Sequence, residues 1–435
     1  MEFLVAPGGS IDGELRVPGD KSISHRSVML GALADDETLV RGFLQGEDAL
    51  ATVAAFRALG VSIEGPQRGE LRISGVGLRG LRAPAGPLDM GNSGTSMRLL
   101  SGILAGQPFA TELIGDASLM RRPMQRVITP LTRMGAQMDS HEGGRPPLRI
   151  SGGSLRGIHY DLPMASAQVK SCVLLAGLFA DGETSVTEPA ATRDHTERML
   201  RGFGYEVREK AGVISLDGGG RLHGGEIDVP ADISSAAFFL VAASIAPGSE
   251  LLLTHVGVNP TRTGVLHILK LMGADLELRN ERSIGGEPVA DILVRHAPLR
   301  GIEIPLELVP LAIDEFPALF IAAACAEGET LLRGAQELRV KESDRIASMA
   351  EGLSTLGVSN TVLDDGIVIS GGHIGGGVIQ THHDHRIAMA FAVAALRAED
   401  EIRILDCEHV ATSFPGFDST ARGAGLKIAV RDSEQ

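Results

Sequence analysis

The chain has 435 residues, of which 43% are hydrophobic and 22% are charged, and its formal net charge is −15 at pH 7. This length predicts at least two domains, because a single hydrophobic core seldom extends over so many residues. The acidic balance argues against general attraction to nucleic acid or to an anionic membrane surface, so we expect neither as a partner. Binding of a small anion depends instead on local clusters of Lys and Arg.

The three cysteines, Cys172, Cys325 and Cys407, are far apart and form no C-x-x-C motif. This usage is typical of a reducing compartment and predicts a cytoplasmic protein without a disulfide framework or a zinc ribbon. The first residues lack the basic region and the apolar stretch of a signal peptide. No apolar run approaches the ~18 residues that a membrane-spanning helix needs.

The first notable stretch is VPGDKSISHRS (17–27), which places Gly19, Asp20, Lys21 and Ser22 ahead of a His, an Arg and an apolar run. Gly, Lys and Ser before a helix indicate a site for phosphate. The nucleotide-binding motif G-x-x-x-x-G-K-[ST] is not satisfied, because Asp20 stands between Gly19 and Lys21 and no Gly stands at the required distance upstream. The stretch therefore indicates an anion site of another kind.

One pattern recurs along the chain: a small-residue apolar helix, a turn and a strand. Its copies occupy 28–40, 99–113, 173–186, 239–253, 319–332 and 391–404. An amphipathic helix that ends in Gly, followed by a strand, comes after each copy, at 56–64, 131–139, 200–208, 269–277, 353–361 and 421–430. The period is about 70 residues, longer than that of solenoid repeats. The pattern predicts an α/β protein in which the first helix of each repeat is buried and the second lies outside.

The six repeats divide into two sets of three, with the midpoint near 225–232. Each amphipathic helix should end at a glycine, as expected for a helix C′ residue. These glycines are Gly60, Gly135, Gly204, Gly273, Gly357 and Gly425.

The residues directly before the buried helices combine helix caps with cations. The segments read GDKSISHRS, GNSGTSMR, MASAQVKS, ADISSAA, AIDEFPA and HHDHRIAM. Ser, Asp and Asn are expected there as N-caps. Cations such as Lys21, Arg98 and Arg386 are not, because they oppose the positive end of the helix dipole. Their placement indicates that anions bind at these helix N-termini.

Five motifs follow one another along the chain: PGDKSISHR, GNSGTSMR, RRPMQRV, LRVKESDRI and DHRIAM. Together they resemble the motifs of the 5-enolpyruvylshikimate-3-phosphate (EPSP) synthase family, and the resemblance covers nearly the whole chain. MASAQVKS, TRDHTERML and ATSFPGF are similar to the bacterial branch called class II. The resemblance implies a two-domain, inside-out α/β barrel of the enolpyruvyl transferase type, with three βαβαββ-like repeats in each domain. It implies one domain of residues 20–229 and another of 1–19 plus 230–435, with the active site in the cleft between them.

The resemblance also implies an activity. The enolpyruvyl group of phosphoenolpyruvate would be transferred to the 5-hydroxyl of shikimate 3-phosphate, through a tetrahedral ketal, with release of phosphate. This is a step of the shikimate pathway, which leads to chorismate and the aromatic amino acids. The reaction needs no metal or organic cofactor, and we expect a monomer whose partners are its two small-molecule substrates.

The matched motifs imply the substrate contacts. Those to shikimate 3-phosphate are Lys21, Ser22, Arg26, Ser166, Ala167, Gln168, Arg193, Asp314 and Lys341. Those to phosphoenolpyruvate are Lys21, Gly94, Arg122, Gln168, Arg345 and Arg386, with Asn92, Thr95 and His385 as supporting residues. Asp314 would take the proton of the attacking hydroxyl and Glu342 would protonate the methylene carbon, while Lys21 would lie between both substrates.

Two positions depart from the pattern of the family. Many relatives carry Ser where this chain has Ala167, and many carry a Lys near Thr412, so Thr412 is not assigned to phosphoenolpyruvate. The small Gly94 suggests sensitivity to glyphosate, the herbicide that acts on this family, because a bulkier residue there would exclude it.

The assigned residue types suit this chemistry. Two phosphates and a carboxylate share one site, and the planar fork of Arg binds such groups with two hydrogen bonds. We expect RVKESDRI to be helical, with Lys341 and Arg345 four apart on one face and Glu342 beside them. Asp314 could serve both as base and as N-cap of the helix that follows it.

Three other interpretations compete with this one. THHDHR could bind a metal through His382, His383 and His385, although the spacing fits no zinc pattern and Arg386 would repel a cation. A UDP-N-acetylglucosamine enolpyruvyl transferase would share the repeats; such enzymes usually present a Cys, occasionally an Asp, where this chain has GDASLMRRPM with Asp116. A non-catalytic scaffold that binds anions would not need Asp314 or Glu342.

Overall fold

The computed structural model describes residues 1–432, which form two compact units. Unit 1 consists of Met1–Pro18, Pro230–Ser283 and the chain from Pro288 onward; unit 2 consists of Gly19–Val229 and Ile284–Glu287. The expected boundaries differ in two places, because Gly19 and the segment 284–287 group with unit 2. Within the described chain, no helix is both long enough and apolar enough to cross a bilayer.

Contacts with α6 (His195–Gly202) explain why the segment 284–287 groups with unit 2. The ring of His195 lies 2.8 Å from the carboxylate of Glu287, and both residues are buried. Arg198 donates a hydrogen bond to the backbone oxygen of Gly286 over 3.0 Å. The repeat pattern could not indicate this, since it contains no information on which turn is held by side chains of another repeat.

Unit 2 has the predicted alternation of helices and strands. Its helices are α1 (Lys21–Leu33), α2 (Glu47–Ala58), α3 (Gly94–Ala105), α4 (Gln125–Met134), α5 (Ala167–Gly177) and α6 (His195–Gly202), with a 3-10 turn η1 (Leu119–Arg121). Its strands are β3 (Glu37–Arg41), β4 (Ser62–Gln67), β5 (Glu70–Ser74), β6 (Leu88–Asp89), β7 (Ala110–Ile114), β8 (Gln137–His141), β9 (Arg145–Ser151), β10 (Leu155–Arg156), β11 (His159–Asp161), β12 (Ala180–Asp181), β13 (Glu183–Thr187), β14 (Arg208–Lys210), β15 (Val213–Asp217) and β16 (Glu226–Asp228).

Unit 1 repeats the same plan. Its helices are α7 (Ile233–Ile245), α8 (Gly264–Leu271), α9 (Phe316–Ala324), α10 (Arg345–Thr355), α11 (His385–Ala394) and α12 (Phe417–Ala424). Its 3-10 turns are η2 (Leu306–Leu308), η3 (Pro310–Ala312), η4 (Gln336–Val340), η5 (Ala395–Arg397) and η6 (Cys407–Thr412). Its strands are β1 (Glu2–Val5), β2 (Asp12–Leu15), β17 (Glu250–Gly257), β18 (Asp275–Ile284), β19 (Glu287–Arg295), β20 (Glu329–Leu332), β21 (Asn360–Leu363), β22 (Gly366–Ser370), β23 (Gly377–Gln380), β24 (Ile402–Leu405) and β25 (Ile428–Arg431).

One strand order recurs in both units. In unit 2 the sheets run β16-β3-β5-β4, β6-β7-β9-β8 and β11-β13-β15-β14, and in each the first pair is parallel and the others are antiparallel. In unit 1, β2-β17-β19-β18 and β23-β24-β1-β25 also begin with a parallel pair. The sheet β20-β22-β21 has an isolated parallel bridge, Glu303 to Leu331, at the corresponding position. The sequence repeat is therefore a repeat of topology.

The N-terminal residues complete two sheets of unit 1. β1 pairs antiparallel with both β24 and β25, so that Phe3 lies opposite Ile404 on one side and Val430 on the other. β2 pairs parallel with β17. Side chains of several strands alternate between buried and exposed, as in β5 and β9. One face of each such sheet therefore packs on helices and the other faces solvent.

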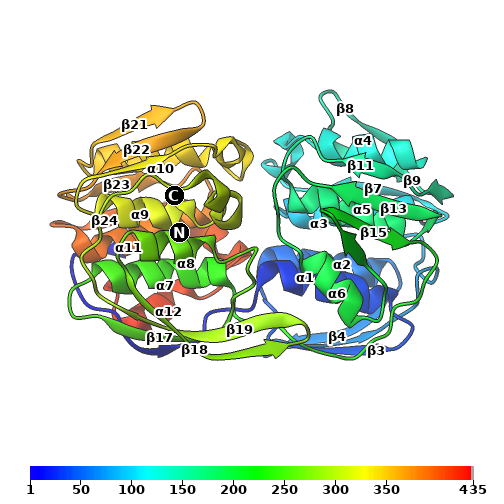
Figure 1. The fold of residues 1–435 in the computed structure, drawn as a ribbon, viewed down its shortest axis with the longest axis horizontal. Helices are drawn as coiled ribbons and strands as arrows, with labels where there is room; N and C mark the ends of the chain where they lie inside the picture. The colour runs from blue at the N-terminus through cyan, green and yellow to red at the C-terminus, as the bar shows by residue number, and fades with distance from the viewer. Residues whose placement is uncertain (433–435) are drawn as a thin grey trace. The chain divides into compact units, whose positions relative to one another are not determined.

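The predicted burial of the apolar helices is confirmed. All residues of α7, α9 and α11 are buried, and these helices pack against one another inside unit 1 (Figure 1). In unit 2, α3 and α5 are in close contact through Gly102. A Cβ atom at Gly102 would come within 2.3 Å of the backbone oxygen of Cys172, so any side chain there would force the helices apart. Small residues in these helices thus allow close packing of the core.

The amphipathic helices cover these cores and end as predicted. α4, for example, buries Val127, Leu131 and Met134 on one face. All six predicted helix-terminating glycines have positive φ, from +79° to +120°. That conformation strains residues with a Cβ atom, which explains the glycine in each repeat.

Candidate active site

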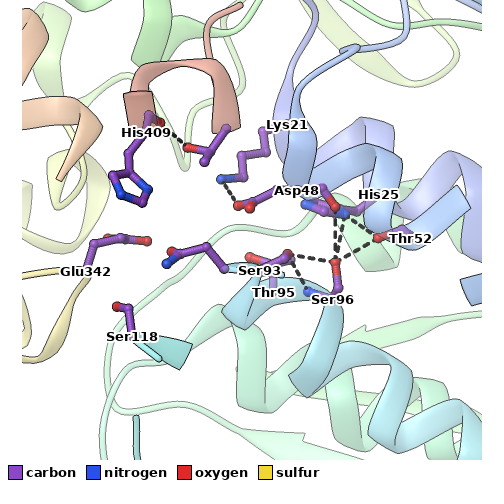
Figure 2. A network of polar contacts seen from close by, with 12 residues as sticks. Lys21, His25, Asp48, Thr52, Ser93, Thr95, Ser96, Ser118, Glu342 and His409 are labelled. Carbon is purple, nitrogen blue, oxygen red and sulfur yellow. Dashed lines mark hydrogen bonds and ion pairs between the residues drawn. The ribbon is translucent and has the colours of Figure 1, made fainter. Parts of the chain in front are cut away.

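In unit 2, Lys21 is the first residue of α1. The helix is capped by Asp20, whose carboxylate accepts a hydrogen bond from the backbone N–H of Ile23 over 2.8 Å. Lys21 forms an ion pair with Asp48 of α2, as Figure 2 shows. The partly exposed ammonium is thereby held at the positive end of a helix, where it can meet an anion.

A buried chain of polar groups links α1 to the start of α3 (Figure 2). His25 Nδ1 lies 2.8 Å from Thr52 Oγ1, and Thr52 Oγ1 lies 2.7 Å from Ser96 Oγ. Ser96 Oγ is in turn 2.7 Å from Ser93 Oγ, the N-cap of α3. Burial, together with the charges of Lys21 and Arg26, lowers the pKa of His25 well below 6.5, so this imidazole is neutral at pH 7.

Arg26 lies in the interior of unit 2. Its Nε donates to Thr196 Oγ1 over 2.7 Å, one Nη donates to Ser171 Oγ over 2.8 Å, and the other donates to the backbone oxygen of Ser22 over 2.9 Å. Burial lowers the pKa of Arg26 to about 10. The guanidinium of Arg26 thus connects α1, α5 and α6. It also holds the backbone of Ser22, which is predicted to contact the substrate.

Arg98 and Arg122 meet beside Gly94 at the start of α3. A Cβ atom at Gly94 would lie 2.9 Å from one nitrogen of Arg98 and 3.2 Å from one of Arg122. Arg122 also donates to Asn92 Oδ1 over 2.6 Å, and Asn92 Nδ2 donates to Asp116 over 2.7 Å. Two guanidinium groups at one helix N-terminus form a strong site for an anion.

The start of α5 is joined to that of α3 by Gln168. Its Oε1 accepts a hydrogen bond from Arg98 over 2.7 Å, and its Nε2 donates to Thr95 Oγ1 over 3.0 Å. Ser166 is the N-cap of α5 and Ala167 its first residue. Arg193, half-buried, stands two residues before the first residue of α6. Unit 2 therefore brings most of its predicted site residues to the starts of its helices.

In unit 1, Arg345 is buried and surrounded by carboxylates. Its Nε donates to Asp384 over 2.8 Å, one Nη to Asp314 over 3.2 Å and the other to Glu342 over 2.6 Å. Burial alone would lower the pKa of Arg345, but Asp384, Glu342 and Asp314 raise it above its usual value. Burial would likewise raise the pKa of Asp384, but the charge and hydrogen bond of Arg345, together with the charge of His385, lower that pKa overall.

The predicted helix over RVKESDRI is wrong. α10 begins at Arg345, and Lys341 follows the 3-10 turn η4. Asp344 ends the irregular stretch by capping α10, since its carboxylate accepts from the backbone N–H of Ala347 over 3.0 Å. Lys341 and Arg345 nevertheless meet at one carboxylate, since Lys341 Nζ lies 3.3 Å from Asp314 Oδ1.

The sequence suggested that Asp314 could be the N-cap of α9, but it is not. The capping position belongs to Glu315, whose side chain makes no capping hydrogen bond. Glu315 is buried and forms a hydrogen bond with Ser234 at the start of α7, next to Arg262. Asp314 is therefore available to Lys341 and Arg345, both of which lie within 3.3 Å of its Oδ1.

Arg386 differs from the other predicted site cations. It is the second residue of α11, 9% exposed, and its backbone N–H donates to the N-cap Asp384 over 2.9 Å. In residues 1–432 its guanidinium has no hydrogen bond or ion pair to another side chain or to the backbone. His385, its neighbour, is buried. An unpaired guanidinium at a helix N-terminus is a strong candidate ligand for an anion.

The three histidines of THHDHR do not converge on one point. His382 pairs with Glu351 over 2.8 Å, the ring of His383 packs edge-on against that of His409 at 5.1 Å, and His385 begins α11. In the described chain, no three or more His, Cys, Asp and Glu residues are grouped so that they could hold a metal ion. Thr412, at the position where many relatives carry Lys, donates to the backbone oxygen of His409 over 2.6 Å.

Sequence reasoning missed several residues that hold the predicted ones in place. Asp384 is the partner of Arg345, and Asp48 is the partner of Lys21. In the sequence, the only indication of these roles is that each aspartate stands at the start of a helix. Lys170 had a clearer signal, because it stands within the apolar helix AQVKSCVLLAG, where a cation needs a buried partner.

Comparison with known proteins agrees with this arrangement. The profile of the family described as EPSP synthase (3-phosphoshikimate 1-carboxyvinyltransferase) matches residues 5–420. The 3-phosphoshikimate 1-carboxyvinyltransferase of Alkalilimnicola ehrlichii is 66% identical over 436 residues, covering 100% of this chain and 98% of that protein. The protein of the same name from Methylococcus capsulatus is 65% identical, covering 98% of each chain.

Solved structures give the same result. The EPSP synthase of Acinetobacter baumannii has a TM-score of 0.89 and 59% identity, covering 99% of this chain and 100% of that one. The enolpyruvyl transferase NikO of Streptomyces tendae has a TM-score of 0.78 at 18% identity over 98% of both chains, a likeness of fold alone. The family profile and the 59% identical structure identify an enolpyruvyl transferase, as the sequence motifs predicted. Within that class, the chain belongs to the EPSP synthase family.

Proposed function

We propose that the chain transfers the enolpyruvyl group of phosphoenolpyruvate to the 5-hydroxyl of shikimate 3-phosphate. Relatives with 60–66% identity over nearly their whole length are named for this reaction. The observation that carries the proposal is the set of Asp314, Glu342 and Arg345 in unit 1, where two carboxylates bind one buried guanidinium. Addition and elimination at an enol ether need a base and an acid, and this set supplies both.

The two carboxylates have complementary roles in the reaction. Asp314 accepts the proton of the 5-hydroxyl as its oxygen attacks C2 of phosphoenolpyruvate, and Glu342 gives a proton to C3. The product is a tetrahedral ketal. A proton then returns from C3 to Glu342, the bond between C2 and the bridging oxygen breaks, and phosphate departs with that oxygen and with the proton that Asp314 had taken up. The steps need no external oxidant, reductant or cofactor.

Cations bind the substrates in this proposal. For phosphoenolpyruvate these are Lys21, Arg122, Arg345 and Arg386, with Gln168 and the backbone of Gly94. The pair of guanidinium groups beside Gly94 and the unpaired Arg386 support this assignment. Arg345 acts chiefly by holding Asp314 and Glu342, because its bonds to three carboxylates occupy most of its donors.

Shikimate 3-phosphate contacts the remaining predicted residues. Ser166, Gln168 and Arg193 lie at the starts of α5 and α6, where helix N-termini favour a phosphate. Lys341 is held 3.3 Å from Asp314, so it can contact the sugar-like ring close to the base. Lys21, Ser22, Arg26, Asp314 and the backbone of Ala167 complete the set.

We propose further that the enzyme acts as a monomer in the cytoplasm, without nucleic acid as a partner. All three cysteines are free thiols and two of them are buried, which suits a reducing compartment. The net charge of −15 argues against nucleic acid.

A coupled assay for phosphate release tests the function, with shikimate 3-phosphate or UDP-N-acetylglucosamine as the acceptor. We expect turnover with shikimate 3-phosphate alone. Asp116 speaks against the other acceptor, because its two oxygens accept bonds from Asn92 and from the backbone of Leu119, which makes it a structural residue. Turnover with UDP-N-acetylglucosamine alone, or with neither acceptor, would contradict the proposal.

A further inference from the structure

Lys170 is a buried cation in a place where two effects oppose it. It belongs to the first turn of α5, where the helix dipole disfavours positive charge. Its side chain is only 1% exposed, so its ammonium has lost nearly all of its hydration. Such a residue persists only where its surroundings supply compensating contacts.

The compensating contacts all come from the segment that surrounds Arg193. Lys170 Nζ lies 3.2 Å from Glu188 Oε1 and 2.9 Å from Glu197 Oε1. It also donates to the backbone oxygen of Thr192 over 3.4 Å. The ammonium group of Lys170 therefore binds three residues of the segment 188–197, of which Glu188 and Thr192 precede Arg193 and Glu197 follows it.

Glu188 closes the part of this segment that precedes Arg193. It accepts a hydrogen bond from the backbone N–H of Thr192 over 3.1 Å and another from the hydroxyl of Thr192 over 2.6 Å. Residues 188–192 thus form a closed turn whose acceptors face Lys170. The residue directly before Arg193, Thr192, is therefore held in place through its backbone.

The part that follows Arg193 is fixed by Arg26. Thr196 Oγ1 accepts from Arg26 Nε over 2.7 Å and donates to Ser171 Oγ over 2.7 Å. Ser171 is the residue next to Lys170 on α5. Adjacent residues of α5 therefore hold the chain before and after Arg193, while Arg193 itself remains half-buried.

We propose that Lys170 is a positioning residue for binding of shikimate 3-phosphate: it sets the place of Arg193, the proposed ligand of the 3-phosphate. Lys170 does not contact the substrate, because its ammonium is buried and bound to Glu188, Thr192 and Glu197. This inference rests on the proposed function. A misplaced guanidinium weakens a bidentate contact with phosphate, and small displacements have large effects on such contacts.

Steady-state kinetics of Lys170→Met test the inference, because Met keeps most of the side-chain length and removes the charge. We expect the KM for shikimate 3-phosphate to rise about tenfold while kcat and the KM for phosphoenolpyruvate change less than about threefold. Binding of shikimate, which lacks the phosphate, should stay within about twofold of wild type. A folded Lys170→Met protein with an unchanged KM for shikimate 3-phosphate, or with equal losses for shikimate and its phosphate, would overturn the inference.

A double-mutant cycle with Arg193→Gln separates an effect through Arg193 from a general one. If Lys170 acts through Arg193, adding Lys170→Met to Arg193→Gln should raise the KM for shikimate 3-phosphate by less than about twofold. Full additivity of the two changes would refute the inference and leave the proposed function intact. Absence of turnover with shikimate 3-phosphate in the wild-type enzyme would instead refute the proposed function.

Two further variants guard against misfolding. Arg208→Met is the matched control, because it removes an arginine that pairs with Glu183 and Asp217 on the surface of the same unit, and we expect wild-type kinetics. Glu188→Gln weakens one contact of Lys170 at a side chain that is 11% exposed. We expect it to fold and to raise the KM for shikimate 3-phosphate about threefold, and an unchanged KM would count against the inference even if Lys170→Met did not fold.

Discussion

Arg345 Nε donates to Asp384 Oδ2 over 2.8 Å, and this bond joins the first residue of α10 to the N-cap of α11. Asp384 also accepts from Ser343 and from the backbone N–H of Arg386. One carboxylate therefore fixes Arg345, which holds Asp314 and Glu342, and the helix start that carries Arg386. The geometry of the candidate site in unit 1 depends on this residue.

Replacing Asp384 by Asn should destabilise the protein at pH 7 by about 3 kcal/mol, because it leaves a buried guanidinium with one counter-charge fewer. The folded-state pKa of Asp384 is lowered, so its contribution is complete above the unfolded-state value of about 3.9 and is lost as pH falls through the folded-state value. Urea unfolding at several pH values should therefore show a constant difference from wild type down to about pH 4 and a smaller one below.

Asp344→Asn is the control for that measurement. Asp344 also caps a helix and pairs with an arginine, Arg339, but its side chain is 37% exposed. We expect a loss of less than about 1 kcal/mol. An equal loss in both variants would show that capping alone, and not the pair with Arg345, accounts for the effect of Asp384.

Replacing Asp314 by Asn should lower kcat by about 10³, because a neutral amide does not accept the proton of the attacking hydroxyl. The amide oxygen keeps a hydrogen-bond acceptor near Lys341 and Arg345, so binding of both substrates should change less than about fivefold. Rapid-quench kinetics with calorimetric binding check both expectations. Retention of most of the activity would remove Asp314 from the catalytic role.

Replacing Gly94 by Ala should weaken binding of phosphoenolpyruvate and of glyphosate. The added Cβ atom would press on Arg98 at 2.9 Å and on Arg122 at 3.2 Å, and would occupy space between the two guanidinium groups. We expect the KM for phosphoenolpyruvate to rise about tenfold and the inhibition constant of glyphosate to rise more. Gly86→Ala is the control, since no heavy atom lies within 4 Å of a Cβ atom there. Equal, small changes in both variants would speak against a crowded anion site.

Replacing His25 by Gln should flatten the dependence of stability on pH below neutrality. The pKa of His25 is lowered well below 6.5 by burial and by Lys21 and Arg26, so between the folded-state pKa and about pH 6.5 only the unfolded state gains a proton. His25 therefore costs the wild-type protein about 1.4 kcal/mol of stability per pH unit in this range, and His25→Gln should lack this term. Identical pH profiles for the two proteins, measured by urea unfolding, would mean that His25 is protonated in the folded state.

The sequence was sufficient for the architecture. The repeat of apolar helix, strand, amphipathic helix and glycine follows from burial and from backbone sterics, both of which act locally. Gly60 and Gly425 end helices at opposite ends of the chain for the same reason, the positive φ of the residue after a helix. The grouping of residues 1–19 with the second half of the chain needed the family resemblance, and the pairing of β1 with β24 and β25 came only from the structure, because periodicity does not show which distant strands are neighbours.

The partners of the site residues were harder to predict. The matched motifs pointed to Arg345, Asp314 and Glu342, but not to Asp384 or to the bonds that join these three carboxylates to one guanidinium. The helix predicted over Lys341 failed because spacing alone did not reveal that Asp344 caps a helix that begins one residue later. The local sequence pattern thus indicated which residues belong to the site, whereas the partner of each residue is determined by tertiary contacts.

The fate of the bridging oxygen of phosphoenolpyruvate tests the account most directly. Addition and elimination break the bond between C2 and this oxygen, whereas phosphoryl transfer would break its bond to phosphorus. With phosphoenolpyruvate labelled by ¹⁸O at that position and shikimate 3-phosphate as acceptor, mass spectrometry should find the label in the released phosphate and none in the enolpyruvyl product. Label retained on the three-carbon fragment, or no release of phosphate at all, would contradict the account.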